Sequence, residues 1–133
     1  RIALRTEDGR ILGDVDLLGI LICNLVDNAV RYAGEGGRIE VICRRDVRDG
    51  IGGIALCVAD DGPGVAKEER ERIFHRFYRA NGGGNGDGAS RSSGSGIGLS
   101  LVARIARTHH ARIHVEDGLD GKGLAITVFF PAA

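Results

Sequence analysis

The sequence lacks an excess of charge, because its 18 basic side chains balance 18 acidic ones. This balance argues against a protein held on nucleic acid or an anionic membrane by bulk charge, so we expect no nucleic-acid partner. No run is long and apolar enough to span a bilayer, and no signal peptide opens the chain. The strand-like start, residues 1–4, suggests a piece of something longer. We therefore expect membrane attachment only through other parts of a full-length protein.

Cysteine is also scarce: Cys23, Cys43 and Cys57 are an odd number without a C-x-x-C pair, and each lies in an apolar segment. We interpret them as reduced, buried thiols of a cytosolic protein, with one disulfide as the alternative. With 133 residues, 43% of them hydrophobic, the chain fits one domain spanning residues 1–133.

Glycine, in contrast, is abundant. Residues 80–95 are rich in glycine and serine, and Gly94-Ser-Gly-Ile-Gly-Leu99 then opens an amphipathic run. Glycines leave backbone N–H groups uncovered, and a helix start adds unpaired donors and a positive dipole, so this junction favours an anion such as phosphate. The pattern indicates nucleotide chemistry.

Three common nucleotide motifs are missing. The one Gly-Lys pair, Gly121-Lys122, precedes Gly123 rather than Ser or Thr, which excludes a Walker A loop. Leu99 breaks the G-x-G-x-x-G dinucleotide fingerprint. The protein-kinase set has no match, since His75-Arg76 is followed by Phe77. The phosphate loop must therefore belong to another fold.

Hydrophobic periodicity predicts an α+β domain. Asp14 offers a helix N-cap, and Asp49-Gly50 offers a turn between two alternating runs that read as an antiparallel pair. We expect a two-layer α/β sandwich, a mixed sheet of about five strands covered on one face by three helices. The predicted helices are 15–33, 67–79 and 97–109, and the strands are 38–44, 53–59, 112–116 and 124–130, preceded by a small hairpin or two brief strands at 2–5 and 10–12.

Four stretches, in order, resemble the nucleotide-binding boxes of the GHKL superfamily, and most closely those of the catalytic and ATP-binding domain of bacterial sensor histidine kinases. Leu21-Ile-Cys-Asn-Leu-Val-Asp-Asn-Ala-Val-Arg-Tyr32 resembles the N box, and Asp60-Asp-Gly-Pro-Gly-Val65 the first glycine box. Ile73-Phe-His-Arg-Phe-Tyr-Arg79 resembles the F box, and residues 94–99 the second glycine box. The resemblance covers essentially the whole chain and implies the Bergerat-type ATP-binding fold.

The N box carries two asparagines one helical turn apart. Asn24 and Asn28 would present amide oxygens on one face, which suits the hard cation Mg²⁺, although a solvated helix face is the simpler interpretation of the pattern alone. The resemblance makes Asn28 the Mg²⁺ ligand and a catalytic residue, with Asn24 lining the same site. It also brings Arg31 to the phosphates and Tyr32 to the purine.

Asp60 closes an apolar strand and could accept a hydrogen bond from the adenine amino group, with Gly62 and Gly64 letting the base approach the backbone. The alternative is an ordinary turn. The resemblance adds a contact from Val65, and a catalytic contact from Arg79 to the γ-phosphate, for which a solvated helix end is the alternative. Residues 80–95 read as a mobile lid or a plain linker. The second box would contribute Gly96, Ile97, Gly98 and Leu99.

The resemblance implies a protein histidine kinase that binds ATP with Mg²⁺ and donates the γ-phosphate to a histidine on a separate dimerisation domain. None of the four histidines lies in a phosphoacceptor motif, so we expect that domain to be absent and the chain alone not to autophosphorylate. A response-regulator receiver domain is the further partner, in two-component signalling from the cytoplasmic side of an inner-membrane sensor. Alternatives are an anti-sigma-type serine kinase of the same superfamily and a non-catalytic, nucleotide-dependent interaction module.

Overall fold

The computed structural model describes residues 2–6, 11, 13–75 and 98–132. Five strands form one sheet in the order β1-β2-β3-β5-β4. Strand β1 runs parallel to β2, and the other neighbours are antiparallel, so the prediction of a mixed sheet is confirmed. The strands are β1 (Ile2–Thr6), β2 (Ile39–Arg48), β3 (Ile51–Asp60), β4 (Arg112–Asp117) and β5 (Leu124–Pro131).

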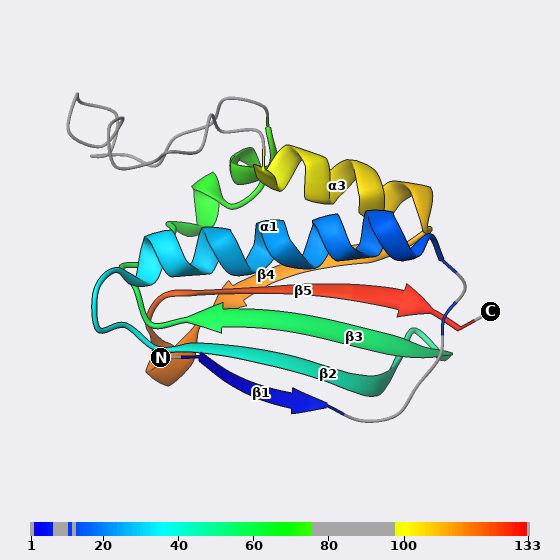
Figure 1. Ribbon diagram of the computed structural model, residues 1–133, viewed down its shortest axis with the longest axis horizontal. Helices are drawn as coiled ribbons and strands as arrows, with labels where there is room; N and C mark the ends of the chain where they lie inside the picture. Colours follow the sequence, from blue (N-terminus) through cyan, green and yellow to red (C-terminus); the bar gives the residue numbers. More distant parts are fainter. Residues whose placement is uncertain (1, 7–10, 12, 76–97, 133) are drawn as a thin grey trace.

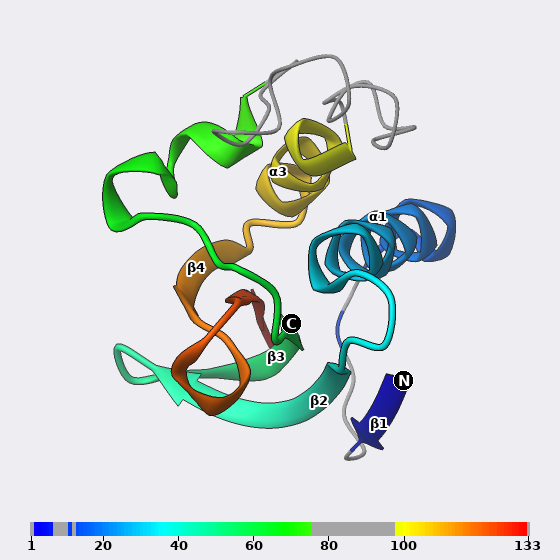
Figure 2. The ribbon, with the colours of Figure 1, turned by 90° about the vertical axis from the view of Figure 1, so that its left-hand side faces the viewer.

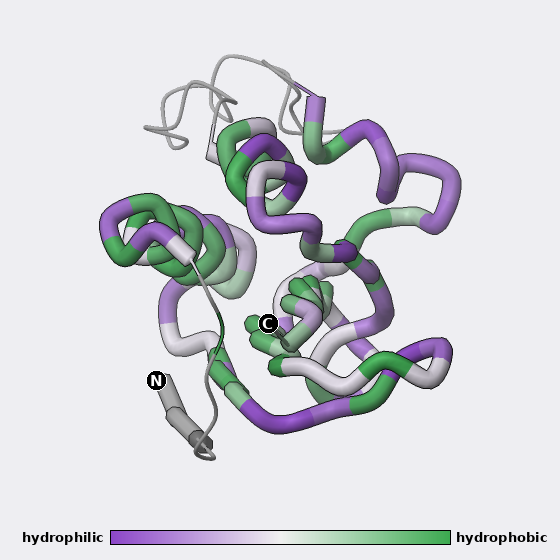
Figure 3. The backbone as a smooth tube through the Cα atoms, turned by 90° about the vertical axis from the view of Figure 1, so that its right-hand side faces the viewer, coloured by the Kyte–Doolittle hydropathy of each residue, from purple (hydrophilic) through white to green (hydrophobic). Residues whose placement is uncertain are grey.

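Two α-helices, α1 (Val15–Ala33) and α3 (Gly98–Thr108), lie side by side on one face of this sheet (Figures 1 and 2). The core fills the space between the two layers. The strands bring mainly aliphatic residues to it. Figure 3, coloured by the hydropathy of each residue, shows that β2 becomes hydrophilic toward its hairpin end. Fully buried members include Leu21, Leu25, Val102, Leu124 and Val128. The two-layer architecture predicted from periodicity is therefore confirmed.

The start of α1 is tied to the end of α3. The Asp14 carboxylate accepts a hydrogen bond from the Leu17 N–H at 3.1 Å, which makes Asp14 the predicted N-cap. The Asp14 N–H in turn donates to Nε2 of His109 at 3.1 Å. Nδ1 of His109 lies 2.8 Å from the Ile105 carbonyl oxygen, so Nδ1 carries the ring proton and Nε2 accepts. His109 is thus a structural residue.

The α-helix predicted over residues 67–79 is wrong for the part of that range that the structure describes. Residues 67–74 form two short 3₁₀ helices, η1 (Lys67–Glu69) and η2 (Arg72–Phe74), and His75 is already extended. Their N–H groups bond three residues back, as in Arg70 N–H to Lys67 O and His75 N–H to Arg72 O. Here the burial of Ile73 in the core, where it is 3% exposed, outweighs the formation of a regular α-helix. Residues 76–79 lie outside the described residues.

At the N-terminus, the first of the two predicted brief strands is confirmed as β1, whereas residues 7–10 and 12 lie outside the described residues. Strand β1 pairs in parallel with β2, Ile2 opposite Ile39, and the chain crosses between them through α1. The Asp49-Gly50 turn is confirmed, with φ of 52° and 77° at its two residues, the left-handed pair that a two-residue hairpin needs.

The cysteines are free thiols as predicted, but none of them is fully buried. Cys43 and Cys57 are half-buried, whereas Cys23 is exposed on α1. Ile20, Ile22 and Val30 of the same helix are exposed as well, so an apolar setting in the sequence did not ensure burial. Among the residues described, neither α-helix is long and apolar enough to cross a membrane.

Candidate functional site

The N-box stripe of α1 meets the first residue of α3. Asn24 donates from Nδ2 to the Ile20 carbonyl oxygen at 2.8 Å, within its own helix. Its Oδ1 faces Gly98, where an added Cβ atom would lie 2.9 Å from that oxygen. Asn28, one turn further along α1, is half-buried. The fold thus brings the N box to the described end of the second glycine box.

The C-terminal end of α1 meets the first glycine box. A Cβ atom at Gly62 would overlap the Tyr32 carbonyl oxygen, so the loop after β3 packs directly on the helix backbone. Burial raises the pKa of Tyr32, and the nearby Asp60 carboxylate raises it further. Arg31 is exposed and pairs with Asp27 at 2.8 Å.

Asp60 ends β3 with 2% of its surface exposed. Its Oδ1 accepts hydrogen bonds from the N–H groups of Gly62, at 2.9 Å, and Leu124, at 3.3 Å. Burial raises the pKa of Asp60 above its ordinary value, and the two backbone hydrogen bonds oppose that shift. A buried carboxylate of this kind is costly unless a partner uses it, which makes it a candidate recognition group.

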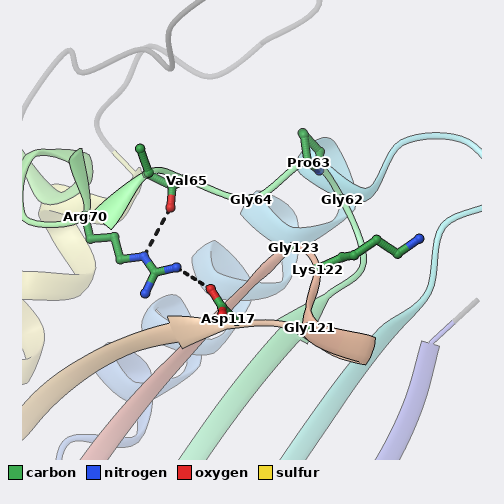
Figure 4. A pocket seen from close by; sticks show the side chains of 10 residues that line it. Gly62, Pro63, Gly64, Val65, Arg70, Asp117, Gly121, Lys122 and Gly123 are labelled. Carbon is green, nitrogen blue, oxygen red and sulfur yellow. Dashed lines mark hydrogen bonds and ion pairs between the residues drawn. The ribbon is translucent and has the colours of Figure 1, made fainter. Parts of the chain in front are cut away.

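The loop formed by the first glycine box, residues 60–65, is called the first glycine loop. It also borders a pocket of about 360 Å³ (Figure 4). Gly62, Gly64 and Val65 line one side, and the connection between β4 and β5 lines the other. Gly64 has a φ of 79°, and a Cβ atom there would lie 2.9 Å from the Gly123 carbonyl oxygen. The side chain of Val65 packs against the core. The loop therefore contacts both the hydrophobic core and the connection between β4 and β5.

Some of the predicted site residues are buried in the core or lie outside the described residues. Leu99 is 7% exposed and belongs to the hydrophobic core, beneath the start of α3. Arg79, Gly96, Ile97 and the predicted lid 80–95 lie outside the described residues. Among the residues described, no group of three or more His, Cys, Asp or Glu side chains could hold a metal ion. A metal at this site would depend on the amide oxygens of α1.

Sequence reasoning missed the residues that hold the first glycine loop. Gly118 and Gly123 leave room for the Asp60 carbonyl oxygen, which a Cβ atom at either position would overlap. Arg38 and Arg70 bind the loop from its two ends. No local pattern in the sequence marks either glycine as a point of close approach, and none marks either arginine.

Comparison with known proteins identifies the family of the chain. Residues 13–133 match the family model described as "Histidine kinase-, DNA gyrase B-, and HSP90-like ATPase". The chain is 40% identical over 131 residues to the sensor protein kinase PmrB of Pseudomonas aeruginosa, covering 98% of the chain and 25% of that protein. It is 36% identical over 123 residues to the sensor-like histidine kinase SenX3 of Mycobacterium tuberculosis, covering 92% of the chain and 28% of that protein.

The fold agrees as well. The solved structure of the mycobacterial sensor histidine kinase MprB superposes with a TM-score of 0.79 at 28% identity, over 98% of this chain and 82% of that one. The chain spans about a quarter of the length of the curated relatives above. It belongs to the family of histidine kinase-, DNA gyrase B- and HSP90-like ATPases, as a catalytic domain of the sensor histidine kinase type.

Proposed function

We propose that the chain binds ATP with Mg²⁺ and donates the γ-phosphate to a histidine of a sensor histidine kinase. The buried Asp60 carboxylate is the observation that carries this proposal. It lies where α1, the first glycine loop and β5 converge, and it accepts hydrogen bonds that keep its position fixed. An acceptor held in this way can select adenine, which offers an amino group where guanine offers a carbonyl.

The donor set fits both ligands. Tyr32 and Gly62 lie beside Asp60, and Gly64 and Val65 continue the same loop along the pocket, so apolar and backbone groups that suit a purine lie on this side of the site. Asn28, with Asn24 beside Gly98, offers amide oxygens, which suit Mg²⁺ when the nucleotide phosphates bring the negative charge. Bound Mg²⁺ would neutralise charge on the phosphates. Arg31 would add a cation nearby, and by resemblance Arg79 and the segment Gly96 to Leu99 would reach the phosphates.

A solved relative supports nucleotide binding. ShkA, described in full length in complex with AMPPNP, is 30% identical to this chain, with a TM-score of 0.69 over 99% of the chain and 26% of that protein. Phosphoryl transfer asks mainly for positioning and for neutralisation of charge, which side chains of this site can supply. The acceptor histidine would lie on a dimerisation domain, and a response-regulator receiver domain would take the phosphoryl group next. The full-length protein would be a membrane sensor with this domain on its cytoplasmic side.

The test measures binding and transfer separately. Calorimetric titration with ATP and Mg²⁺ should show binding to the chain and its loss in Asp60→Ala and Asn28→Ala, whereas Asp16→Ala, exposed at the start of α1, should bind normally. Transfer of labelled γ-phosphate to a separately produced dimerisation domain should require both residues. Transfer that survives both substitutions would refute the assignment. Binding without transfer to any histidine partner would favour the non-catalytic interaction module instead.

A further inference from the structure

The connection between β4 and β5, residues 118–123, packs against the first glycine loop. A Cβ atom at Gly118 or Gly123 would overlap the Asp60 carbonyl oxygen. The loop itself touches the same segment at Gly64, beside the Gly123 carbonyl oxygen. These contacts bring two backbones together but hold them only by packing. A loop of glycines needs further bonds to keep one conformation.

Arg70 supplies such bonds at the far end of the loop (Figure 4). It follows η1, and its Nε donates to the Val65 carbonyl oxygen at 3.1 Å. Its Nη2 pairs with Oδ1 of Asp117, at the end of β4, at 2.6 Å. The Arg70 side chain is only 15% exposed. One guanidinium thus joins the loop carbonyl to the sheet edge, a double contact that its planar fork allows.

A second arginine holds the near end of the loop. The backbone N–H of Arg38 donates to Oδ1 of Asp61 at 2.9 Å, and its Nη2 pairs with Asp120 in the β4–β5 connection. The Arg38 side chain is 48% exposed, so its ion pairs contribute less than those of a shielded group. The first glycine loop is therefore linked at Val65 to the end of β4 and at Asp61, through Arg38, to the connection between β4 and β5.

We propose that Arg70 is a positioning residue for nucleotide binding: it fixes Val65 against Asp117 and so sets the wall of the purine site relative to Asp60. This inference rests on the proposed function. Arg70 would act through the Val65 backbone rather than by contact with the nucleotide. Loss of the guanidinium should therefore weaken recognition of the base and leave the contribution of Mg²⁺ unchanged.

The test uses the whole chain and ADP as the probe. Arg70→Gln should bind ADP roughly fivefold to tenfold more weakly, by the same factor with and without Mg²⁺, since the part-buried, charge-assisted bond to the Val65 carbonyl oxygen is lost. Arg70→Lys, which keeps the charge but cannot make both bonds, should fall between Arg70→Gln and the unaltered chain. Asp117→Asn should weaken binding about twofold, and in combination with Arg70→Gln should add little further loss.

Amide exchange in the free chain reports the mechanism directly. Residues 62–66 should exchange at least threefold faster in Arg70→Gln, with exchange in α1 unchanged. Arg72→Gln is the matched control, because Arg72 is 66% exposed and pairs with Glu69 at 3.5 Å, away from the loop. It should change neither affinity nor exchange. Thermal melting of each variant verifies that binding is measured on folded protein.

Several results would overturn the proposal. These are unchanged ADP affinity in Arg70→Gln, a loss seen only with Mg²⁺, or an equal loss in Arg72→Gln. If the unaltered chain binds no ADP, the proposed function fails and the nucleotide role of Arg70 fails with it. The exchange measurement then still shows whether Arg70 holds the loop, so the two failures are distinguishable.

Discussion

The amide oxygen of Asn24 on α1 lies so close to Gly98, the first residue of α3, that a Cβ atom there would stand 2.9 Å from it. The two helices therefore approach each other closely at a glycine, beside an N-box side chain. Because the close atom is the end of a flexible side chain, an added methyl group would displace Asn24 rather than the backbone.

Gly98→Ala should consequently change binding more than folding. We expect the free energy of unfolding to change by less than about 1 kcal/mol, because alanine also favours the helix. Affinity for ATP with Mg²⁺ should fall roughly fivefold, as Asn24 leaves its place. Calorimetry and thermal melting measure the two effects. Gly19→Ala is the control: nothing lies within 4 Å of its added Cβ atom, so it should stabilise α1 by about 0.5–1 kcal/mol and leave affinity intact.

Asp60→Asn should stabilise the protein at neutral pH while abolishing nucleotide binding. Burial raises the pKa of Asp60 above its ordinary value of 3.8, so the folded state holds the proton more tightly than the unfolded state. The stabilisation from Asp60 is complete below 3.8 and is lost as pH rises through the folded pKa. Melting curves should therefore show Asp60→Asn ahead of the unaltered chain at pH 7, with the advantage shrinking toward pH 4.

Asp46→Asn should behave in the opposite way. The Val47 N–H, at 2.8 Å, and the Arg48 guanidinium hold the pKa of Asp46 below 3.8. Its stabilisation is present above 3.8 and is lost as pH falls through the folded pKa. The unaltered chain should therefore exceed Asp46→Asn in stability at pH 7, and the difference should vanish in acid. The same sign for both variants would contradict these assignments.

His110→Gly should stabilise the end of α3. His110 has a φ of 58°, and the following Ala111 N–H bonds back to the Ala106 carbonyl oxygen, which closes the helix in a left-handed turn. A side chain in that conformation costs about 1 kcal/mol, which glycine avoids. Chemical denaturation should show the gain for His110→Gly and none for His110→Ala, since alanine keeps the strain.

Gly53→Ala should disrupt the sheet. A Cβ atom at Gly53 would overlap the Phe130 carbonyl oxygen on β5 and lie 2.8 Å from Cζ of Phe129. Neither the ladder nor a ring that is 1% exposed can yield cheaply, so we expect a loss of roughly 2–4 kcal/mol in unfolding free energy. Gly52→Ala, with nothing within 4 Å, should be close to neutral. Equal effects at the two positions would show that the hairpin adjusts as a unit.

Local signals predicted the elements with strong local causes. The helix over 15–33 has a capping residue and a long apolar period, and β2 and β3 flank a turn that needs positive φ at both residues. Elements that depend on contacts between distant residues were harder to predict from the sequence. The parallel pairing of β1 is decided by β2, more than thirty residues away, and core burial of Ile73 outweighs helical propensity in residues 67–74.

The candidate site divides in the same way. The stretches that resemble nucleotide boxes could be identified in the sequence, because each is a short contiguous pattern, and the structure describes the N box and the first glycine box in full. The supports of the first glycine loop could not, because they join distant positions: Arg70 to Asp117 spans 47 residues and Arg38 to Asp120 spans 82. A charged residue in a loop carries no local mark of the partner that it will meet.

The buried carboxylate of Asp60 also bears on how such a domain can change over generations. Most substitutions destabilise a protein, and drift readily fixes those that offset the damage. At this position the stabilising exchange would remove the group that we propose selects the base. Selection for folding and selection for recognition therefore pull in opposite directions at residue 60. A lineage released from nucleotide binding should lose this acid early, and would become more robust to heat as it did.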